Sequence, residues 1–76
     1  MKRVMLRALR QTQLYGRLIA RDDGLFHPGG NRALCSLHDA NEMVRSGWLA
    51  IRDGKYEITP DGHRAAESER TLPSRK

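Results

Sequence analysis

The chain has 76 residues, of which 38% are hydrophobic and 30% charged, and its formal net charge is +5. This length fits one domain with a small core. No apolar run approaches the roughly 20 residues of a membrane-spanning helix, and Arg7 and Arg10 interrupt the apolar stretch that a secretion signal needs. Because Cys35 is the single cysteine, it forms no internal disulfide. We therefore expect a soluble cytoplasmic protein.

The positive charge is concentrated at the beginning of the chain. Residues 1–21 contain six basic residues and no acidic one, whereas the other residues contain eight basic and nine acidic side chains. The first 21 residues thus carry all of the net positive charge. Such an asymmetry favours a polyanionic partner, although it does not define a fold.

The first third of the chain predicts a helix followed by a hairpin. Met5, Leu6 and Leu9 repeat at three- and four-residue intervals, which predicts a helix over residues 2–14, and Gly16 follows as a helix stop. Residues 17–28 fit two short strands around Asp22-Asp23-Gly24. A continuation of the first helix to Arg21 explains the same residues, and the sequence leaves both interpretations open.

The second half predicts a helix, a hairpin and a final helix. Ser36 is an N-cap candidate for a helix that ends before Gly47. Residues 48–59 alternate apolar and polar side chains about Asp53-Gly54, a pair suited to a tight hairpin turn. Thr59 is an N-cap candidate for a last helix that begins at Pro60 and runs to about residue 70. Residues 71–76 are expected to form a flexible tail after a single domain over residues 1–70.

This second half resembles the winged-helix domains of the MarR and PadR families. In those families a recognition helix ends on a glycine before an apolar strand, and the second wing strand ends in Tyr-x-Leu/Ile-Thr-x-x-Gly. The matching positions are Val44, Gly47, Leu49, Tyr56, Ile58, Thr59 and Gly62, within residues 34–66. The layout also resembles small phage and mobile-element proteins of this type. It departs from the families because no clear second helix precedes residue 36 and the wing is minimal.

The resemblance implies an α+β fold, a winged helix-turn-helix variant with a two-residue wing turn, and sequence-specific DNA binding. The recognition helix would present His38, Asn41 and Arg45, of which Asn41 suits adenine and Arg45 suits guanine. Asp39 and Glu42 would lie on the same exposed face and oppose phosphates unless they are neutralised locally. An ordinary solvated helix with mixed charges explains these residues equally well.

Two further basic sets are candidate contacts for a polyanion. Arg52 and Lys55 flank the hairpin turn and are expected to hold backbone phosphate. Arg3, Arg7 and Arg10 recur at helical spacing on one face of the first helix. That stripe is either a solubilising face or a contact with phosphate or with an acidic protein.

The sequence contains little that predicts other chemistry. Cys35 and His38 have the spacing of zinc ligands, but one thiol with scattered histidines does not make a tetrahedral site, so we expect no metal and a packed Cys35. Residues 27–31 form a turn rather than a phosphate loop, because no Lys-Ser/Thr follows them. We therefore expect no enzyme activity, no catalytic residues and no cofactor.

Two classes of function follow. The first is a small winged-helix transcriptional regulator of phage or mobile-element origin that binds double-stranded DNA, often as a homodimer. The second is a winged-helix module that binds an acidic protein surface, such as a phage-encoded inhibitor of a nucleic-acid-handling complex, for example an anti-CRISPR protein. The resemblance favours the first class. The acidic residues on the recognition helix and the small wing favour the second.

Overall fold

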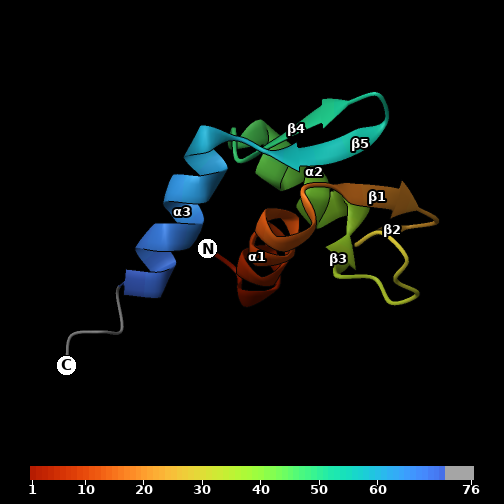
Figure 1. Cartoon of the computed structure of the whole chain (residues 1–76), viewed down its shortest axis with the longest axis horizontal. Helices are drawn as coiled ribbons and strands as arrows, with labels where there is room; N and C mark the ends of the chain where they lie inside the picture. The colour runs from red at the N-terminus through yellow and green to blue at the C-terminus, as the bar shows by residue number, and fades with distance from the viewer. Residues whose placement is uncertain (72–76) are drawn as a thin grey trace.

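A computed structural model describes the backbone of residues 1–71 and the side chains of residues 1–69. It contains three helices and one five-stranded antiparallel sheet (Figure 1). The elements in chain order are α1 (Arg3–Tyr15), β1 (Leu18–Arg21), β2 (Gly24–Phe26), β3 (Cys35–Ser36), α2 (Leu37–Arg45), β4 (Leu49–Arg52), β5 (Lys55–Ile58) and α3 (Pro60–Thr71). The prediction of an α+β fold is confirmed.

Helix α1 follows the predicted periodicity within one residue at each end. Its buried side chains are Met5, Ala8, Leu9 and Thr12, which recur every three or four residues along one face. The helix ends because Gly16 adopts a left-handed conformation with φ +87° and donates its N–H to the carbonyl of Thr12 at 2.8 Å. This C-cap turns the chain sharply into β1.

Residues 18–26 form a hairpin, so the alternative extension of α1 to Arg21 is wrong. The turn is Asp22-Asp23, with Asp22 at a positive φ of 54°. Strand β1 pairs with β2 on one side, where Ile19 lies opposite Phe26, and with β5 on the other. The order of the sheet is β3-β2-β1-β5-β4, which brings the two hairpins together through β1 and β5.

Strand β3 was not predicted, because only two residues form it. Residues 27–34 leave β2 as a loop and return to it, and the Leu34 N–H donates to the carbonyl of Leu25 at 2.7 Å. Cys35 then pairs with Leu25. This return places residues 27–34, drawn in yellow in Figure 1, beside α1 rather than in a helix ahead of α2.

Helix α2 begins and ends where the sequence predicts. The Ser36 hydroxyl accepts a hydrogen bond from the backbone N–H of Asp39 at 3.1 Å, which satisfies one of the free donors of the first turn. After the helix, Gly47 has φ +84°. Ala40 and Met43 are fully buried and turn this side of α2 toward the sheet, where it packs against β4.

The β4–β5 hairpin has the predicted turn. Asp53 and Gly54 both have positive φ, 52° and 76°, as a type I′ turn requires. Leu49 lies opposite Ile58 and Ile51 lies opposite Tyr56, so these four side chains share one face of the hairpin. The turn matches the right-handed twist of the strands, which is why two residues are sufficient to connect them.

Helix α3 is connected to the hairpin through Thr59. The Thr59 hydroxyl accepts the N–H of Gly62 at 2.9 Å and donates to the carbonyl of Gly47 at 2.5 Å, so one side chain caps α3 and fixes the start of the hairpin. Gly62 is buried against the carbonyl of Trp48. The helix includes Thr71, where the sequence predicted the flexible tail to begin, and the rest of that tail lies outside the described residues.

The core lies between α1, α2 and one face of the sheet. Its fully buried large side chains include Leu9, Leu18, Leu25, Met43 and Leu49. Trp48, directly before the hairpin, is half-buried and packs against this cluster. None of the helices in the described part of the chain combines the length and the apolar character that crossing a membrane requires.

Candidate functional site

Helix α2 brings its three candidate contacts together on one exposed side. His38, Asn41 and Arg45 occupy successive turns, and all three are exposed. The buried residues of the helix lie on its other side, against the sheet. We refer to His38, Asn41 and Arg45 as the α2 surface.

Asp39 does not belong to that surface, so its predicted exposure is wrong. Its side chain is only 13% exposed, and one carboxylate oxygen lies 3.0 Å from Nζ of Lys2. The hydrogen bond from Lys2 lowers the pKa of the Asp39 carboxyl below its usual 3.8, although burial acts in the opposite direction. Asp39 is therefore a neutralised structural group between the start of α1 and the start of α2.

Glu42 is also neutralised within the helix. Its carboxylate accepts a hydrogen bond from the Arg45 guanidinium at 2.9 Å, across an i,i+3 spacing. The same contact engages one nitrogen of the Arg45 guanidinium, and the Arg45 side chain remains 74% exposed. Both carboxylates that would repel a polyanion at α2 thus have a cationic partner.

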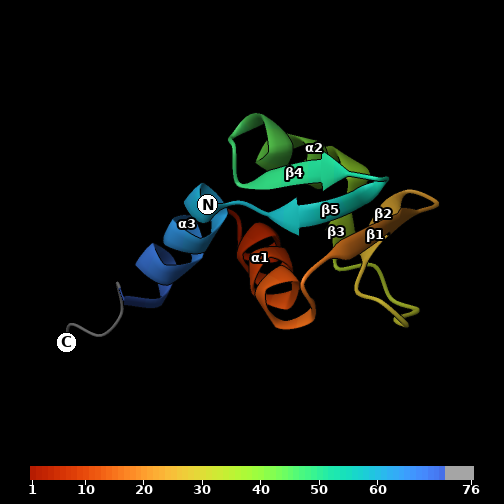
Figure 2. The ribbon, with the colours of Figure 1, turned by 45° about the horizontal axis from the view of Figure 1, so that its top comes forward.

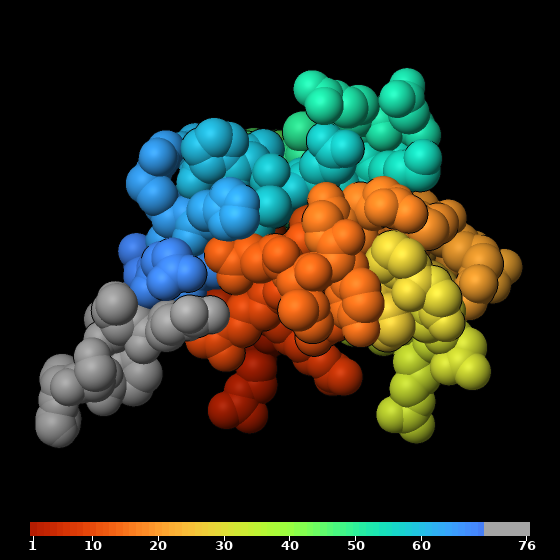
Figure 3. Space-filling model, viewed as in Figure 1, coloured from red at the N-terminus to blue at the C-terminus, as the bar shows by residue number. Residues whose placement is uncertain are grey.

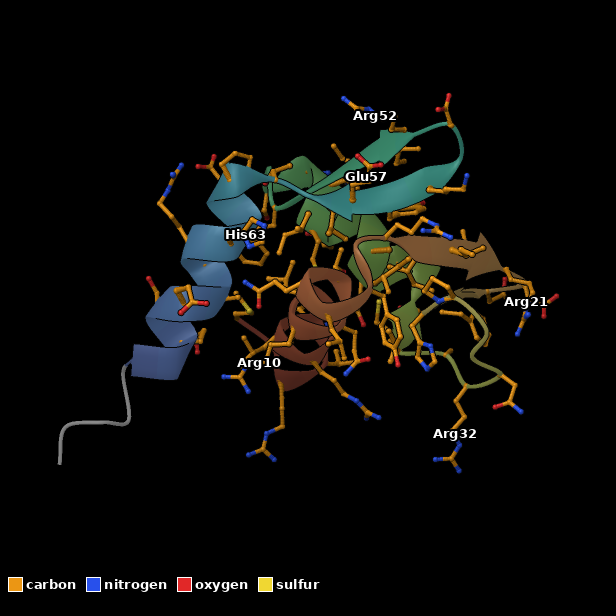
Figure 4. The ribbon with its side chains drawn as sticks, in the orientation of Figure 1. Arg10, Arg21, Arg32, Arg52, Glu57 and His63 are labelled. Carbon is orange, nitrogen blue, oxygen red and sulfur yellow. The ribbon has the colours of Figure 1, made fainter. Side chains whose placement is uncertain are left out.

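The hairpin places Arg52 and Lys55 away from α2. They are cross-strand partners and point to the same face of the hairpin. Because side chains alternate along a strand, this face is opposite to the one that carries the buried Leu49 and Tyr56. Arg52 also lies 3.7 Å from Glu57, and both residues are labelled in the upper part of Figure 4. The α2 surface and the hairpin cations therefore do not form one continuous patch.

The charges of α2 and the hairpin balance one another. Arg45, Arg52 and Lys55 are the cations, and three exposed or half-buried carboxylates accompany them, on Glu42, Asp53 and Glu57. An excess of positive charge strengthens phosphate binding, and here the charges cancel, so contacts with nucleic acid on this side would depend on individual side chains rather than on a net positive charge. The excess lies elsewhere.

Helix α1 carries that excess on the side away from the core. Arg3, Arg7 and Arg10 are exposed, and among residues 1–69 no hydrogen bond or ion pair engages them. Arg32 joins them from the loop of residues 27–34 and is likewise unpaired within the described side chains. We refer to these four residues as the arginine surface.

Two adjoining hollows connect the members of the arginine surface. One, of about 350 Å³, lies between α1 and the loop and is lined by Arg7, Gln11, Asn31 and Arg32 among others. The other, of about 490 Å³, lies between α1 and α3 and includes Arg7 and Gln11 again. Side chains from the first part of α1 and from the loop project from the same lower edge of the molecule in Figure 3.

Arg32 could not be assigned to this surface from the sequence, because 22 positions separate it from Arg10. The loop is held against α1 by an aromatic contact and against β1 by a polar one. The rings of Tyr15 and His27 stack with their centroids 4.5 Å apart, and Arg21 donates to the Gly30 carbonyl at 3.3 Å. The position of Arg32 therefore follows from the packing of the loop.

Cys35 is part of the core, as expected. Its side chain is buried next to Leu25, and desolvation, with a smaller contribution from the Asp39 charge, raises the pKa of the thiol to about 11. Among the residues that the structure describes, no three His, Cys, Asp or Glu side chains are grouped closely enough to hold a metal ion.

Comparisons with family models, with curated proteins and with solved structures found no match to this chain.

Proposed function

We propose that this protein binds double-stranded DNA as a winged-helix variant in which α2 enters the major groove. The order helix, strand, helix and hairpin, with β1 beside β5, supports this assignment. In the variant, the β1–β2 hairpin and the loop of residues 27–34 occupy the place of the second helix of a helix-turn-helix.

The observation that carries the proposal is the neutralisation of both carboxylates on α2. Asp39 is turned inward to Lys2, and Glu42 is paired with Arg45. Each carboxylate therefore keeps its cationic partner when the helix approaches the DNA and water is excluded, which avoids the cost of desolvating an unpaired charge. The α2 surface then presents only neutral or cationic groups that suit base edges, with Asn41 for adenine and Arg45 for guanine.

The hairpin supplies the flanking contacts in this proposal. Arg52 and Lys55 border the turn at the end of a hairpin that projects from the body of the molecule (Figure 1). Contacts of this kind hold the DNA backbone without selecting a sequence. A transcriptional regulator needs base contacts as well as phosphate contacts, and the assignment of base contacts to α2 and phosphate contacts to the hairpin supports that role.

Selection of preferred sequences from a random duplex pool, followed by binding measurements, tests the proposal. Asn41→Ala and Arg45→Ala should each reduce the preference for the selected sequence by about 5- to 150-fold, the range for one bidentate base contact. Arg17→Ala is the matched control. Arg17 is exposed but belongs neither to the α2 surface nor to the arginine surface, so this variant should keep the preference for the selected sequence. Failure of the wild-type protein to bind any duplex more tightly than about 10 µM at moderate salt would contradict DNA binding.

Arg52→Ala and Lys55→Ala test the hairpin separately. Each should weaken binding to selected and unselected duplexes equally and reduce the salt slope by about one phosphate contact. A change in sequence preference instead would mean that the hairpin reads bases.

A further inference from the structure

We propose that the arginine surface is a second DNA site, which holds phosphate backbone independently of the α2 surface. Together with the proposed function, on which this part rests, one molecule would then bridge two segments of DNA. The first observation is the separation of the two surfaces. Arg10 and Arg32 extend from the lower side of the molecule in Figure 4, whereas α2 lies behind the β4–β5 hairpin in the upper part of Figures 1 and 2.

The second observation is that these guanidinium groups are free. Arg21, Arg45, Arg52 and Arg64 each use the guanidinium in a contact within the protein. Arg3, Arg7, Arg10 and Arg32 have no such contact within residues 1–69. Glu69 is the one carboxylate that borders the hollows, where it lies at the edge formed with α3. Four free arginines against one carboxylate make a surface complementary to a polyanion.

The third observation concerns the spacing and the neighbours of the arginines. Arg3, Arg7 and Arg10 follow one stripe of α1 at successive turns, with a rise of about 1.5 Å per residue. Gln11 and Asn31 line the hollow between Arg7 and Arg32 and add neutral donors. A row of cations with interspersed amide donors suits a regular chain of phosphates, because guanidinium groups bind phosphate oxygens in pairs.

An acidic protein is a poorer fit to this surface. Protein interfaces rely on a desolvated apolar or aromatic centre, and the lining of the two hollows offers only the partly buried Leu6 and the buried Leu34. His27 is the one ring there, and it is already stacked on Tyr15. The surface thus offers charge and amide groups without an apolar anchor, which favours a phosphate backbone.

The salt dependence of binding isolates the arginine surface. In protein carrying Asn41→Ala and Arg45→Ala, binding to a duplex of arbitrary sequence should still weaken steeply with salt. Adding Arg7→Gln and Arg32→Gln should make the slope of log K against log salt shallower by about 1.8 and weaken binding about 60-fold at 0.1 M salt. The matched control adds Arg17→Gln and Arg64→Gln, which removes the same charge elsewhere and should leave the slope unchanged. Equal slopes in the two quadruple variants would overturn the proposal.

A capture assay tests the bridging. Otherwise wild-type protein on an immobilised selected duplex should retain a second, fluorescent duplex of arbitrary sequence, and Arg7→Gln with Arg32→Gln should abolish this capture while the first complex persists. Capture that survives these substitutions would overturn the proposal, because a dimer with one α2 surface per subunit would explain it. A third outcome is a steep salt dependence that requires the arginine surface, without capture of the second duplex. This result would support the arginine surface as a DNA site and count against α2 as a DNA-binding helix.

An acidic partner is the remaining outcome. Binding of a polyglutamate peptide that requires Arg7 and Arg32, together with no duplex binding in the α2-substituted protein, would overturn the proposal in favour of a protein ligand. Circular dichroism of each variant confirms the fold. Arg7 and Arg32 are exposed and make no internal contact within the described side chains, so their substitution should leave the fold intact.

Discussion

The ammonium group of Lys2 lies 3.0 Å from a carboxylate oxygen of Asp39, and this contact joins the residue before α1 to the first turn of α2. The Ser36 hydroxyl accepts the backbone N–H of Asp39 at the same point. One group from the start of α1 and two from the start of α2 thus fix where α2 begins and which way its exposed side faces.

This contact predicts a loss of stability in acid. Because the pKa of Asp39 is lowered in the folded protein, the carboxylate stabilises the fold above its unfolded pKa, near 3.8, and that stabilisation is lost as the pH falls below this value toward the folded pKa. Lys2→Gln removes the cation that lowers this pKa, so the free energy of unfolding should fall less steeply as the pH decreases. Urea unfolding between pH 2 and 6 measures it, and identical pH profiles of the two proteins would contradict the ion pair.

The β4–β5 turn predicts a penalty for a β-branched residue at position 54. Gly54→Val should reduce the free energy of unfolding by about 1–2 kcal/mol, since the φ of +76° is unfavourable for a side chain. A Cβ there would contact no other atom within 4 Å, so backbone strain is the only cost. Gly54→Asn should cost less, because Asn tolerates the left-handed region. Thermal unfolding provides the comparison, and equal melting temperatures for Val and Asn would contradict the turn.

Substitution of Gly62 should be penalised by steric overlap rather than by the backbone strain expected at Gly54. A Cβ at this position would overlap the carbonyl of Trp48 and lie 2.7 Å from the side chain of Ile58. Gly62→Ala should therefore destabilise the fold by about 1–3 kcal/mol or more, because backbone must move to make room. Gly29→Ala is the control for backbone strain without overlap, because Gly29 has φ +80° and a Cβ there meets nothing within 4 Å, so Gly62→Ala should cost more. A chemical-denaturation midpoint for Gly62→Ala at or above that of the control would argue against the α3–hairpin contact.

Cys35 predicts slow thiol chemistry in the folded protein. With its pKa raised to about 11, the buried thiol stays protonated near neutral pH, whereas an unfolded thiol has a pKa near 9. Labelling with a thiol-specific disulfide reagent at pH 8 should be far slower in native buffer than in denaturant. The fold should also lose stability as the pH rises from 9 toward 11, because only the unfolded thiol ionises in that range. Rapid native labelling would show that Cys35 is accessible.

The sequence by itself determined the local elements of this protein. Gly16 predicted the end of α1, Ser36 the start of α2, and Asp53-Gly54 the turn of the second hairpin. These signals are readable because a cap or a tight turn involves residues within about four positions of one another. Thr59 was predictable as a cap for the same reason.

Contacts between distant residues were decided only by the tertiary structure. Asp39 lies on the sequence-predicted exposed face of α2, but Lys2, 37 positions away, draws its carboxylate inward. Arg32 joins the stripe on α1 because a loop without regular structure packs beside that helix. Arg52 and Lys55 point away from α2 because the packing of Leu49 and Tyr56 fixes which face of the hairpin is covered. Hydrophobic periodicity defines the faces of each element, but burial against another element decides which face meets solvent, and that choice requires the complete fold.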